Sequence, residues 1–153
     1  MNIDYVTSPL GWVEIVASEE GIQRIEFVEQ QRHQILANQH THNAKQQLTE
    51  YFAGTRQQFD LPLRTQGTVF QQQVWAALVQ IKYADTAAYA DIANMLNNPK
   101  AVRAVGAANG KNPIAIVVPC HRVIGKDGTL TGYAGGLDKK AFLLELERSA
   151  MAQ

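Results

Sequence analysis

The fold of this chain is most strongly indicated by one stretch of sequence, which reads Asn112-Pro113-Ile114-Ala115-Ile116-Val117-Val118-Pro119-Cys120-His121-Arg122-Val123. It holds the only cysteine of the chain, so a disulfide within the chain is excluded. A free cysteine is most often an inert small hydrophobe, but here an imidazole and a guanidinium follow directly. Positive neighbours lower the pKa of a thiol, and the thiolate is the nucleophile. We therefore predict that Cys120 is a reactive thiol.

Two short helices are predicted just before this stretch. Asp85 or Thr86 can cap the first, Asn97-Asn98-Pro99 ends it, and the second covers residues 100–109. Two helices joined by a short turn are typical of a helix-turn-helix, although most such pairs do not touch DNA.

The second of these helices carries few large side chains. Val102 and Val105 are expected to pack into the core, and the remaining face offers alanine, glycine and Arg103. A recognition helix in the major groove normally projects long polar side chains at base edges. A slim helix with one arginine is better suited to the narrow minor groove, where shape dominates recognition. The pattern indicates a surface that searches for lesions rather than one that reads sequence.

Downstream of Cys120 the chain is rich in glycine over residues 124–137, a loop long enough to fold over a ligand. Asp138 can cap a final helix that is expected to turn Ala141, Phe142 and Leu146 inward. Glu147 lies near the end of this helix. Spacing alone favours a solvated carboxylate there, and a catalytic role requires that the helix pack against His121.

The N-terminal part of the sequence is predicted to contain strands. Residues 3–7, 12–17 and 22–28 are predicted to form an antiparallel meander, followed by a polar loop over 29–42 and a helix over 43–53. Thr68 and Gln71 match a capping box that starts another helix. We place a boundary near residue 66, which gives an N-terminal lobe of residues 1–66 and a C-terminal lobe of residues 67–153.

Composition and charge narrow the class of protein. The chain has 153 residues, of which 46% are hydrophobic and 18% charged, as is typical of a soluble globular protein. No apolar run is long enough to cross a bilayer and no signal peptide is visible, so with its free thiol the protein is expected in the cytoplasm. The net charge is zero but uneven: four basic against eight acidic residues over 1–60, and seven against two over 100–140. The basic segment is suited to a polyanion, although such clusters are often only solvated surface.

Taken together, these motifs resemble a known family. The run from Pro119 to Val123, preceded by Asn112-Pro113 and followed by Gly132-Tyr133-Ala134-Gly135-Gly136-Leu137, is similar to the O6-alkylguanine-DNA alkyltransferases. The resemblance is continuous over about residues 70–147, and the N-terminal lobe fits in length and strand pattern without a diagnostic motif. It implies an α+β fold with a ribonuclease H-like N-terminal lobe. The C-terminal lobe would be mostly helical and winged-helix-like, with the helix-turn-helix.

The resemblance also implies a catalytic set. Cys120 would accept the alkyl group from O6 of guanine. Whether it also accepts an alkyl group from O4 of thymine stays open. His121 would act as a base through a water molecule, with Glu147 holding its imidazole. Tyr89 matches the family's proton donor to N3 of the base, and Asn112 matches the hinge asparagine. The thioether product is stable, so each molecule would react once, without a cofactor or a metal.

The implied partner is double-stranded DNA that contains alkylated bases, bound by a monomer and away from membranes. The target nucleotide must leave the stack, and Arg103 matches the arginine that fills the vacated space. The other residues expected to bind DNA are Tyr89, Ala101, Val102, Ala104, Gly106, Ala107, Lys111 and Arg122. The residues expected around the base are Cys120, Val123, Tyr133 and Ala134.

Some features depart from the family or leave alternatives. Ala88 and Ala134 stand where relatives often have serine, and the cysteines with which some relatives bind zinc in the N-terminal lobe are missing. His33, His40 and His42 could form an opportunistic metal site, but a solvated polar loop is favoured.

Two rival functions remain. One is a non-catalytic module that binds alkylated DNA, which Cys120 disfavours because such proteins carry tryptophan in its place. The other is a Cys/His hydrolase or a thiol redox sensor, in which Arg103 and the slim helix would have no purpose.

Overall fold

The computed structural model describes all 153 residues, and the chain divides into two compact units. The first comprises Met1–Gln66 and Pro113–Ala115, and the second comprises Gly67–Asn112 and Ile116–Gln153. The segment 113–115 departs from a simple division near residue 66, since it follows helices of the second unit in the sequence but belongs to the first unit.

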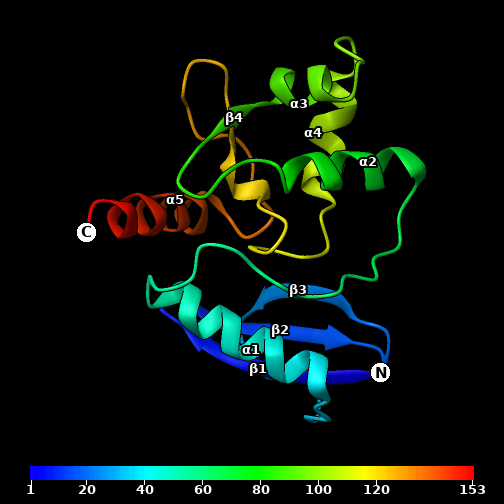
Figure 1. Cartoon of the computed structure of the whole chain (residues 1–153), viewed down its shortest axis with the longest axis vertical. Helices are drawn as coiled ribbons and strands as arrows, with labels where there is room; N and C mark the ends of the chain where they lie inside the picture. Colours follow the sequence, from blue (N-terminus) through cyan, green and yellow to red (C-terminus); the bar gives the residue numbers. More distant parts are fainter. The chain divides into compact units, whose positions relative to one another are not determined.

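The first unit is built on an antiparallel sheet in the order β1-β2-β3 (Figure 1). The strands are β1 (Asn2–Ser8), β2 (Gly11–Ala17) and β3 (Ile22–Val28), which confirms the predicted meander. The first turn is tight because Gly11 adopts a φ of +101°, a conformation that side chains disfavour. Residues 113–115 extend the unit, with the Ile25 N–H donating to the Pro113 carbonyl and the Ala115 N–H to the Ile25 carbonyl, each at 2.9 Å.

Helix α1 (Gln39–Phe52) lies along this sheet and buries Ala44, Leu48 and Tyr51 (Figure 1). The helix begins four residues earlier than the predicted start at residue 43, inside the segment predicted to be a polar loop. Asn38 and Thr41 form a capping box, in which each side chain accepts from the other residue's backbone N–H at 2.9 Å. The prediction was wrong because the glutamines and histidines of this segment are typical of a polar loop, and the capping box was not recognised.

The second unit is mostly helical. Its helices are α2 (Val69–Leu78), α3 (Tyr89–Met95), α4 (Val102–Gly110) and α5 (Leu137–Met151), with the one-turn 3-10 helix η1 (Cys120–Arg122). The Thr68–Gln71 capping box of α2 is present as predicted. Helices α3 and α4 form the helix-turn-helix and pack on α2, where the Trp75 indole donates to the Ala108 carbonyl at 2.9 Å.

Three further helix starts differ from the prediction, and one is that of α4, which begins at Val102 instead of residue 100. Helix α3 begins only at Tyr89 because residues Ala87–Ala88 form the short strand β4, which pairs in parallel with β5 (Val123–Ile124). The carboxylate of Asp91 then accepts from the Ala88 N–H at 2.8 Å. Helix α5 begins at Leu137, one residue before the predicted cap Asp138, which lies in its first turn.

The buried face of α5 also differs from the prediction. The residues that face the interior are Lys140, Leu143, Leu144 and Glu147, whereas Ala141 is exposed. Two of the four buried residues are charged, so a search for an apolar stripe selects the wrong face. Through Lys140 and Glu147 on this face, α5 contacts the segment that follows Cys120.

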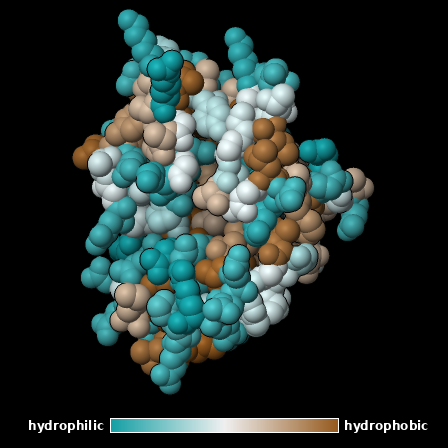
Figure 2. Space-filling model, turned by 180° about the vertical axis from the view of Figure 1, so that it is seen from behind, coloured by the Kyte–Doolittle hydropathy of each residue, from teal (hydrophilic) through white to brown (hydrophobic).

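The visible surface is mixed in character. The space-filling view shows mostly hydrophilic side chains with small, scattered hydrophobic patches on the face it presents (Figure 2). None of the helices combines the length and the apolar character needed to cross a bilayer.

Candidate active site

Cys120 opens the single turn of η1. Its N–H donates to the Val118 carbonyl at 2.8 Å, and the Arg122 N–H donates to the Pro119 carbonyl at 3.0 Å. The chain then enters β5, whose pairing with β4 sets it beside the start of α3 at Tyr89. Local turn geometry and one short parallel pair thus bring the cysteine segment next to the helix-turn-helix.

His121 and Glu147 meet in the interior of the second unit. Both side chains are fully buried, and the imidazole Nε2 lies 2.6 Å from a carboxylate oxygen of Glu147. The condition set for a catalytic Glu147, that its helix pack against His121, is therefore met by α5. Burial lowers the pKa of His121, against the opposing hydrogen bond and charge of Glu147, so the imidazole is neutral near neutral pH. A neutral ring that donates from Nε2 has Nδ1 as an acceptor, and Nδ1 is buried without a protein partner.

Arg122 lies inside the protein rather than on a DNA-facing surface, which corrects its expected role. Only 6% of the residue is exposed. Its guanidinium donates to both oxygens of Glu147, at 2.8 and 3.1 Å, and to the Ile81 carbonyl at 2.8 Å. The physical reason is the buried carboxylate, which needs a fixed countercharge in an apolar interior.

Glu147 is held as an anion by this arrangement. Burial by itself raises the pKa of the carboxyl group, but the hydrogen bonds and charges of His121 and Arg122 outweigh it and bring the value to about 2. The Ala84 N–H, on a residue with a φ of +66°, adds a further donor at 3.1 Å.

The electrostatics of Cys120 differ from the sequence-based expectation. Burial raises the pKa of the thiol and outweighs a hydrogen bond from the Asn112 side chain and the charge of Lys140, both of which lower it. The expected activation by the next two residues is wrong, because His121 is neutral and the charge of Arg122 is committed to Glu147. Asn112 also donates to the Val118 carbonyl at 2.8 Å, which ties the end of α4 to the cysteine segment.

Lys140 is a site residue that the sequence analysis missed. It is fully buried, and its ammonium group donates to the carbonyls of Val123 at 2.5 Å and Thr131 at 2.9 Å. Burial lowers its pKa, while the charge of Cys120 raises it. A lysine in a helix is normally read as surface, and the available signal was its spacing of seven residues from Glu147, which places both on one face.

The glycine-rich loop supplies the remaining predicted residues around the base. Tyr133 is half-buried, and both burial and the charge of Cys120 raise the pKa of its hydroxyl. Val123 is buried, with its N–H donating to the Cys120 carbonyl, and Ala134 is exposed. The Tyr89 hydroxyl lies 2.7 Å from Oγ1 of Thr131, another loop residue that the sequence analysis did not select.

Helix α4 presents small residues on its open face. Exposed there are Val102, Arg103, Ala104, Ala107 and the following Lys111, with Ala101 and Gly106 half-buried. Val105 packs inward as predicted, but Val102 is 37% exposed rather than part of the core. A Cβ added at Gly106 would lie 3.8 Å from the Tyr89 ring, so this glycine brings the open face of α4 close to Tyr89.

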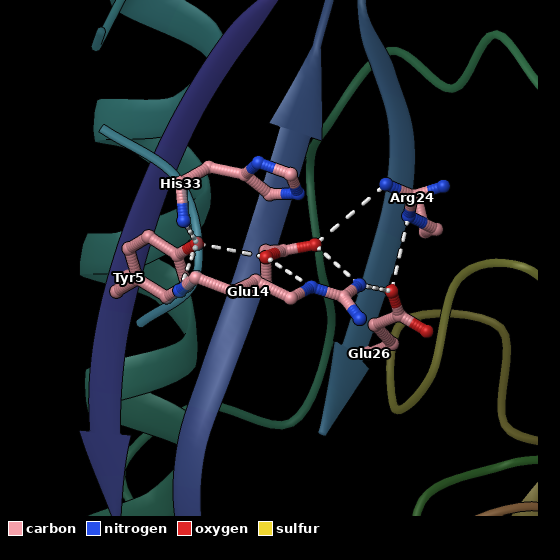
Figure 3. Close-up of polar contacts among 6 residues, drawn as sticks. Tyr5, Glu14, Arg24, Glu26 and His33 are labelled. Atoms are coloured by element: carbon pink, nitrogen blue, oxygen red, sulfur yellow. Dashed lines mark hydrogen bonds and ion pairs between the residues drawn. The ribbon is translucent and has the colours of Figure 1, made fainter. Parts of the chain in front are cut away.

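A second polar cluster, centred on a buried carboxylate, lies in the first unit (Figure 3). Glu14 is fully buried and accepts from the Tyr5 hydroxyl at 2.8 Å and from Arg32 at 2.9 and 3.0 Å, and the hydrogen bond from Arg32 is the main reason that its pKa is lowered. The Tyr5 hydroxyl in turn accepts from the backbone N–H groups of Arg32 and His33. These bonds fasten the segment after β3 to the sheet, and they use the backbone of His33, one of the three histidines considered for a metal.

Comparisons with known proteins agree with the resemblance. The family model of the 6-O-methylguanine DNA methyltransferase DNA-binding domain matches residues 69–149, and that of its ribonuclease-like domain matches residues 1–65. A methylated-DNA–protein-cysteine methyltransferase from Methanosarcina barkeri is 46% identical, with 97% of this chain and 98% of the relative covered. A constitutive one from Bacillus subtilis is 50% identical, with 92% of each covered.

Solved structures give the same picture. Mycobacterium tuberculosis OGT in complex with DNA has a TM-score of 0.90 at 44% identity, over 98% of this chain and 94% of that one. These matches confirm the expected α+β fold, with its ribonuclease-like and DNA-binding parts. By sequence over nearly its whole length and by fold, the chain belongs to the 6-O-methylguanine DNA methyltransferase family.

Proposed function

We propose that this protein repairs DNA by moving the alkyl group from O6 of an alkylated guanine to the sulfur of Cys120. The observation that carries the proposal is the connected set at η1: a buried cysteine followed by a histidine whose Nε2 lies 2.6 Å from an ionised Glu147. The names of the relatives, methylated-DNA–protein-cysteine methyltransferase, support the same reaction.

The reaction needs no cofactor for its atoms and electrons to balance. The Cys120 thiol gives its proton through a water molecule to Nδ1 of His121, and the sulfur attacks the alkyl carbon. The S–C bond forms as the C–O6 bond breaks, and the electron pair passes to the purine. The purine takes up one proton through the Tyr89 hydroxyl, which regains one from the imidazolium by way of solvent. The products are S-alkylcysteine and unmodified guanine, and the stable thioether makes the reaction irreversible.

The buried charges support this role for His121. When the imidazole accepts a proton it becomes a cation 2.6 Å from a carboxylate that is already ionised and fixed by Arg122. No group has to reorganise, so the developing charge is stabilised at once. The raised pKa of the thiol also keeps Cys120 protonated until a substrate and this base act together.

DNA binding is assigned to the open face of α4. Small residues such as Ala104 and Ala107 allow close approach to a minor groove, and exposed Arg103 can enter the stack when the nucleotide rotates out. Lys111 can contact phosphate, whereas Arg122 is left out because it is buried. We infer double-stranded DNA with alkylated bases as the partner, a monomer as the binding form, and the reducing cytoplasm as the compartment in which the thiol stays active.

The test is to incubate the protein with a duplex oligonucleotide that carries one O6-methylguanine and to measure intact and peptide masses. The proposal predicts one methyl group on Cys120 and none in the Cys120→Ala variant. Tight binding of the lesion without transfer would favour a non-catalytic binding module. Methylation of another residue in the Cys120→Ala variant would contradict the assignment of the acceptor.

A further inference from the structure

Thr131 connects three parts of the candidate active site. Its hydroxyl oxygen lies 2.7 Å from the hydroxyl of Tyr89, the first residue of α3. Its carbonyl accepts from the Lys140 ammonium at 2.9 Å, and the same ammonium donates to the Val123 carbonyl at 2.5 Å. One loop residue is therefore bound at once to α3 and, through α5, to the segment of Cys120.

Lys140 anchors these contacts, because it is buried and bound to two backbone carbonyls. An ammonium group only donates, so it holds the backbone of Thr131 through its carbonyl and leaves the Thr131 side chain for Tyr89. Lys140 is fully buried, and its aliphatic stem is enclosed by the protein. Thr131 is thereby held at both its carbonyl and its hydroxyl, although its loop neighbours from Lys126 to Leu130 are exposed.

The loop does not need the Thr131 hydroxyl for its own turn. The turn is closed by the Gly125 N–H, which donates to the Thr129 carbonyl at 2.8 Å, and by Asp127, which accepts from the N–H and hydroxyl of Thr129 at 3.1 and 2.7 Å. The contact between Thr131 and Tyr89 is thus an addition to the loop's internal bonds.

We propose that Thr131 is a positioning residue for alkyl transfer, which donates its hydroxyl proton to the Tyr89 oxygen so that the Tyr89 O–H is aimed at the purine. The inference rests on the proposed function, in which Tyr89 gives the purine its proton. Of the two possible directions of this hydrogen bond, the one from Thr131 to Tyr89 leaves the phenolic proton available. The same bond strengthens as negative charge grows on the phenolic oxygen, which is when stabilisation accelerates the reaction.

The experiment compares rates of methyl transfer from the free base O6-methylguanine and from a methylated duplex, followed by intact mass. Thr131→Val should slow both reactions about tenfold, the effect of losing one hydrogen bond in the transition state. Thr131→Ser, which keeps the hydroxyl, should stay within about threefold of the unmodified protein. Thr131→Ala repeats the loss of the hydroxyl with a different shape, so that a packing defect in one variant is recognised.

Two further variants separate positioning from loop order. In a Tyr89→Phe background, Thr131→Val should cause less than about a twofold further loss, because a residue that acts through the Tyr89 hydroxyl has nothing left to position. Thr129→Val is the matched control, since it removes a hydroxyl from the same loop and weakens its turn without contacting α3. Its rate should remain near that of the unmodified protein.

The outcomes distinguish this inference from the proposed function. Transfer by the unmodified protein together with a Thr131→Val rate equal to it would overturn the inference alone. So would independent losses in the double variant, or a loss in Thr129→Val as large as that in Thr131→Val. An absence of methyl transfer in the unmodified protein would overturn the proposed function, and this inference with it.

Discussion

At the scale of single residues, the site depends on buried polar groups that satisfy one another. Cys120 and His121 are neighbours in the sequence, and Glu147 reaches them only through the packing of α5. The motif and the resemblance were sufficient to select these three. Lys140 and Thr131 were missed because their importance comes from contacts with distant backbone carbonyls and with Tyr89, which no local pattern encodes.

The buried pair of His121 and Glu147 makes stability depend on pH. The pKa of His121 is lowered in the folded state, so the unfolded chain binds a proton first as the pH falls below about 6.5. Glu147 has a pKa of about 2 when folded against an ordinary 4.5, so its contribution is present above 4.5 and is lost as the pH falls toward 2. Both groups therefore destabilise the fold on acidification.

We expect the free energy of unfolding in urea to fall between pH 7 and pH 4, with Glu147 accounting for a change on the order of 3 kcal/mol by pH 2. Glu147→Gln should flatten the part of this dependence that lies below pH 4.5. Glu145→Gln, on an exposed position of the same helix, should not. A free energy of unfolding that is constant down to pH 4 would refute the buried pair.

The two arginines should behave in opposite ways. Arg122→Met removes the countercharge of a buried carboxylate and should cost about 3–5 kcal/mol in urea unfolding. Arg103→Met, at an exposed position of α4, should stay within about 0.5 kcal/mol in stability but bind duplex DNA more weakly. Stability that is unaffected by Arg122→Met, combined with weaker DNA binding, would restore the surface role rejected above.

At the scale of elements, capping explains which helix boundaries could be predicted. The Thr68–Gln71 box is the standard serine/threonine–glutamine type and marked the start of α2 correctly. The Asn38–Thr41 box of α1 uses a less usual pair and was overlooked. The start of α3 depends on the pairing of β4 with β5, in which Ala87 lies opposite Val123, 36 residues later in the sequence. A prediction from the local residues Asp85 and Thr86 therefore placed the start of the helix too early.

Helix α4 should be sensitive to charge on its open face. Ala107→Glu places an anion on the face that we propose enters the minor groove between the two phosphate backbones, and should slow the repair of duplex DNA at least about tenfold at low salt. Reaction with free O6-methylguanine should be unaffected, because the free base does not need this face. Ala141→Glu, on an exposed face of α5, serves as the control and should change neither rate. Equal slowing of both substrates by Ala107→Glu would indicate a damaged fold instead of lost DNA contact.

At the scale of the whole molecule, a neutral chain can still attract DNA because its charges are unevenly placed. Residues 100–140 carry seven basic against two acidic residues, and five of the seven remain after buried Arg122 and Lys140 are removed. The composition could indicate this imbalance, but only the structure separates surface cations from those committed to the interior.

This imbalance predicts a salt dependence for DNA binding. The affinity for an undamaged duplex, measured by fluorescence anisotropy, should fall steeply as the salt concentration rises. The reason is that lysine and arginine side chains that bind phosphates displace the counterions of the DNA. Lys111→Gln should lower the slope of the logarithm of affinity against that of salt concentration by about one. Glu20→Gln, on an exposed position of the first unit, should leave the slope unchanged. An affinity insensitive to salt would exclude phosphate contacts.

In the proposed reaction, Cys120 is consumed when it repairs one lesion. The most direct measurement titrates a fixed amount of protein with an increasing excess of O6-methylguanine duplex and counts restored guanines and S-methylated protein in the same samples. We predict that both counts rise together and stop at one per protein molecule. Restored guanines that continue beyond this number, or that accumulate without a methyl group on Cys120, would show that Cys120 is not the single-use acceptor.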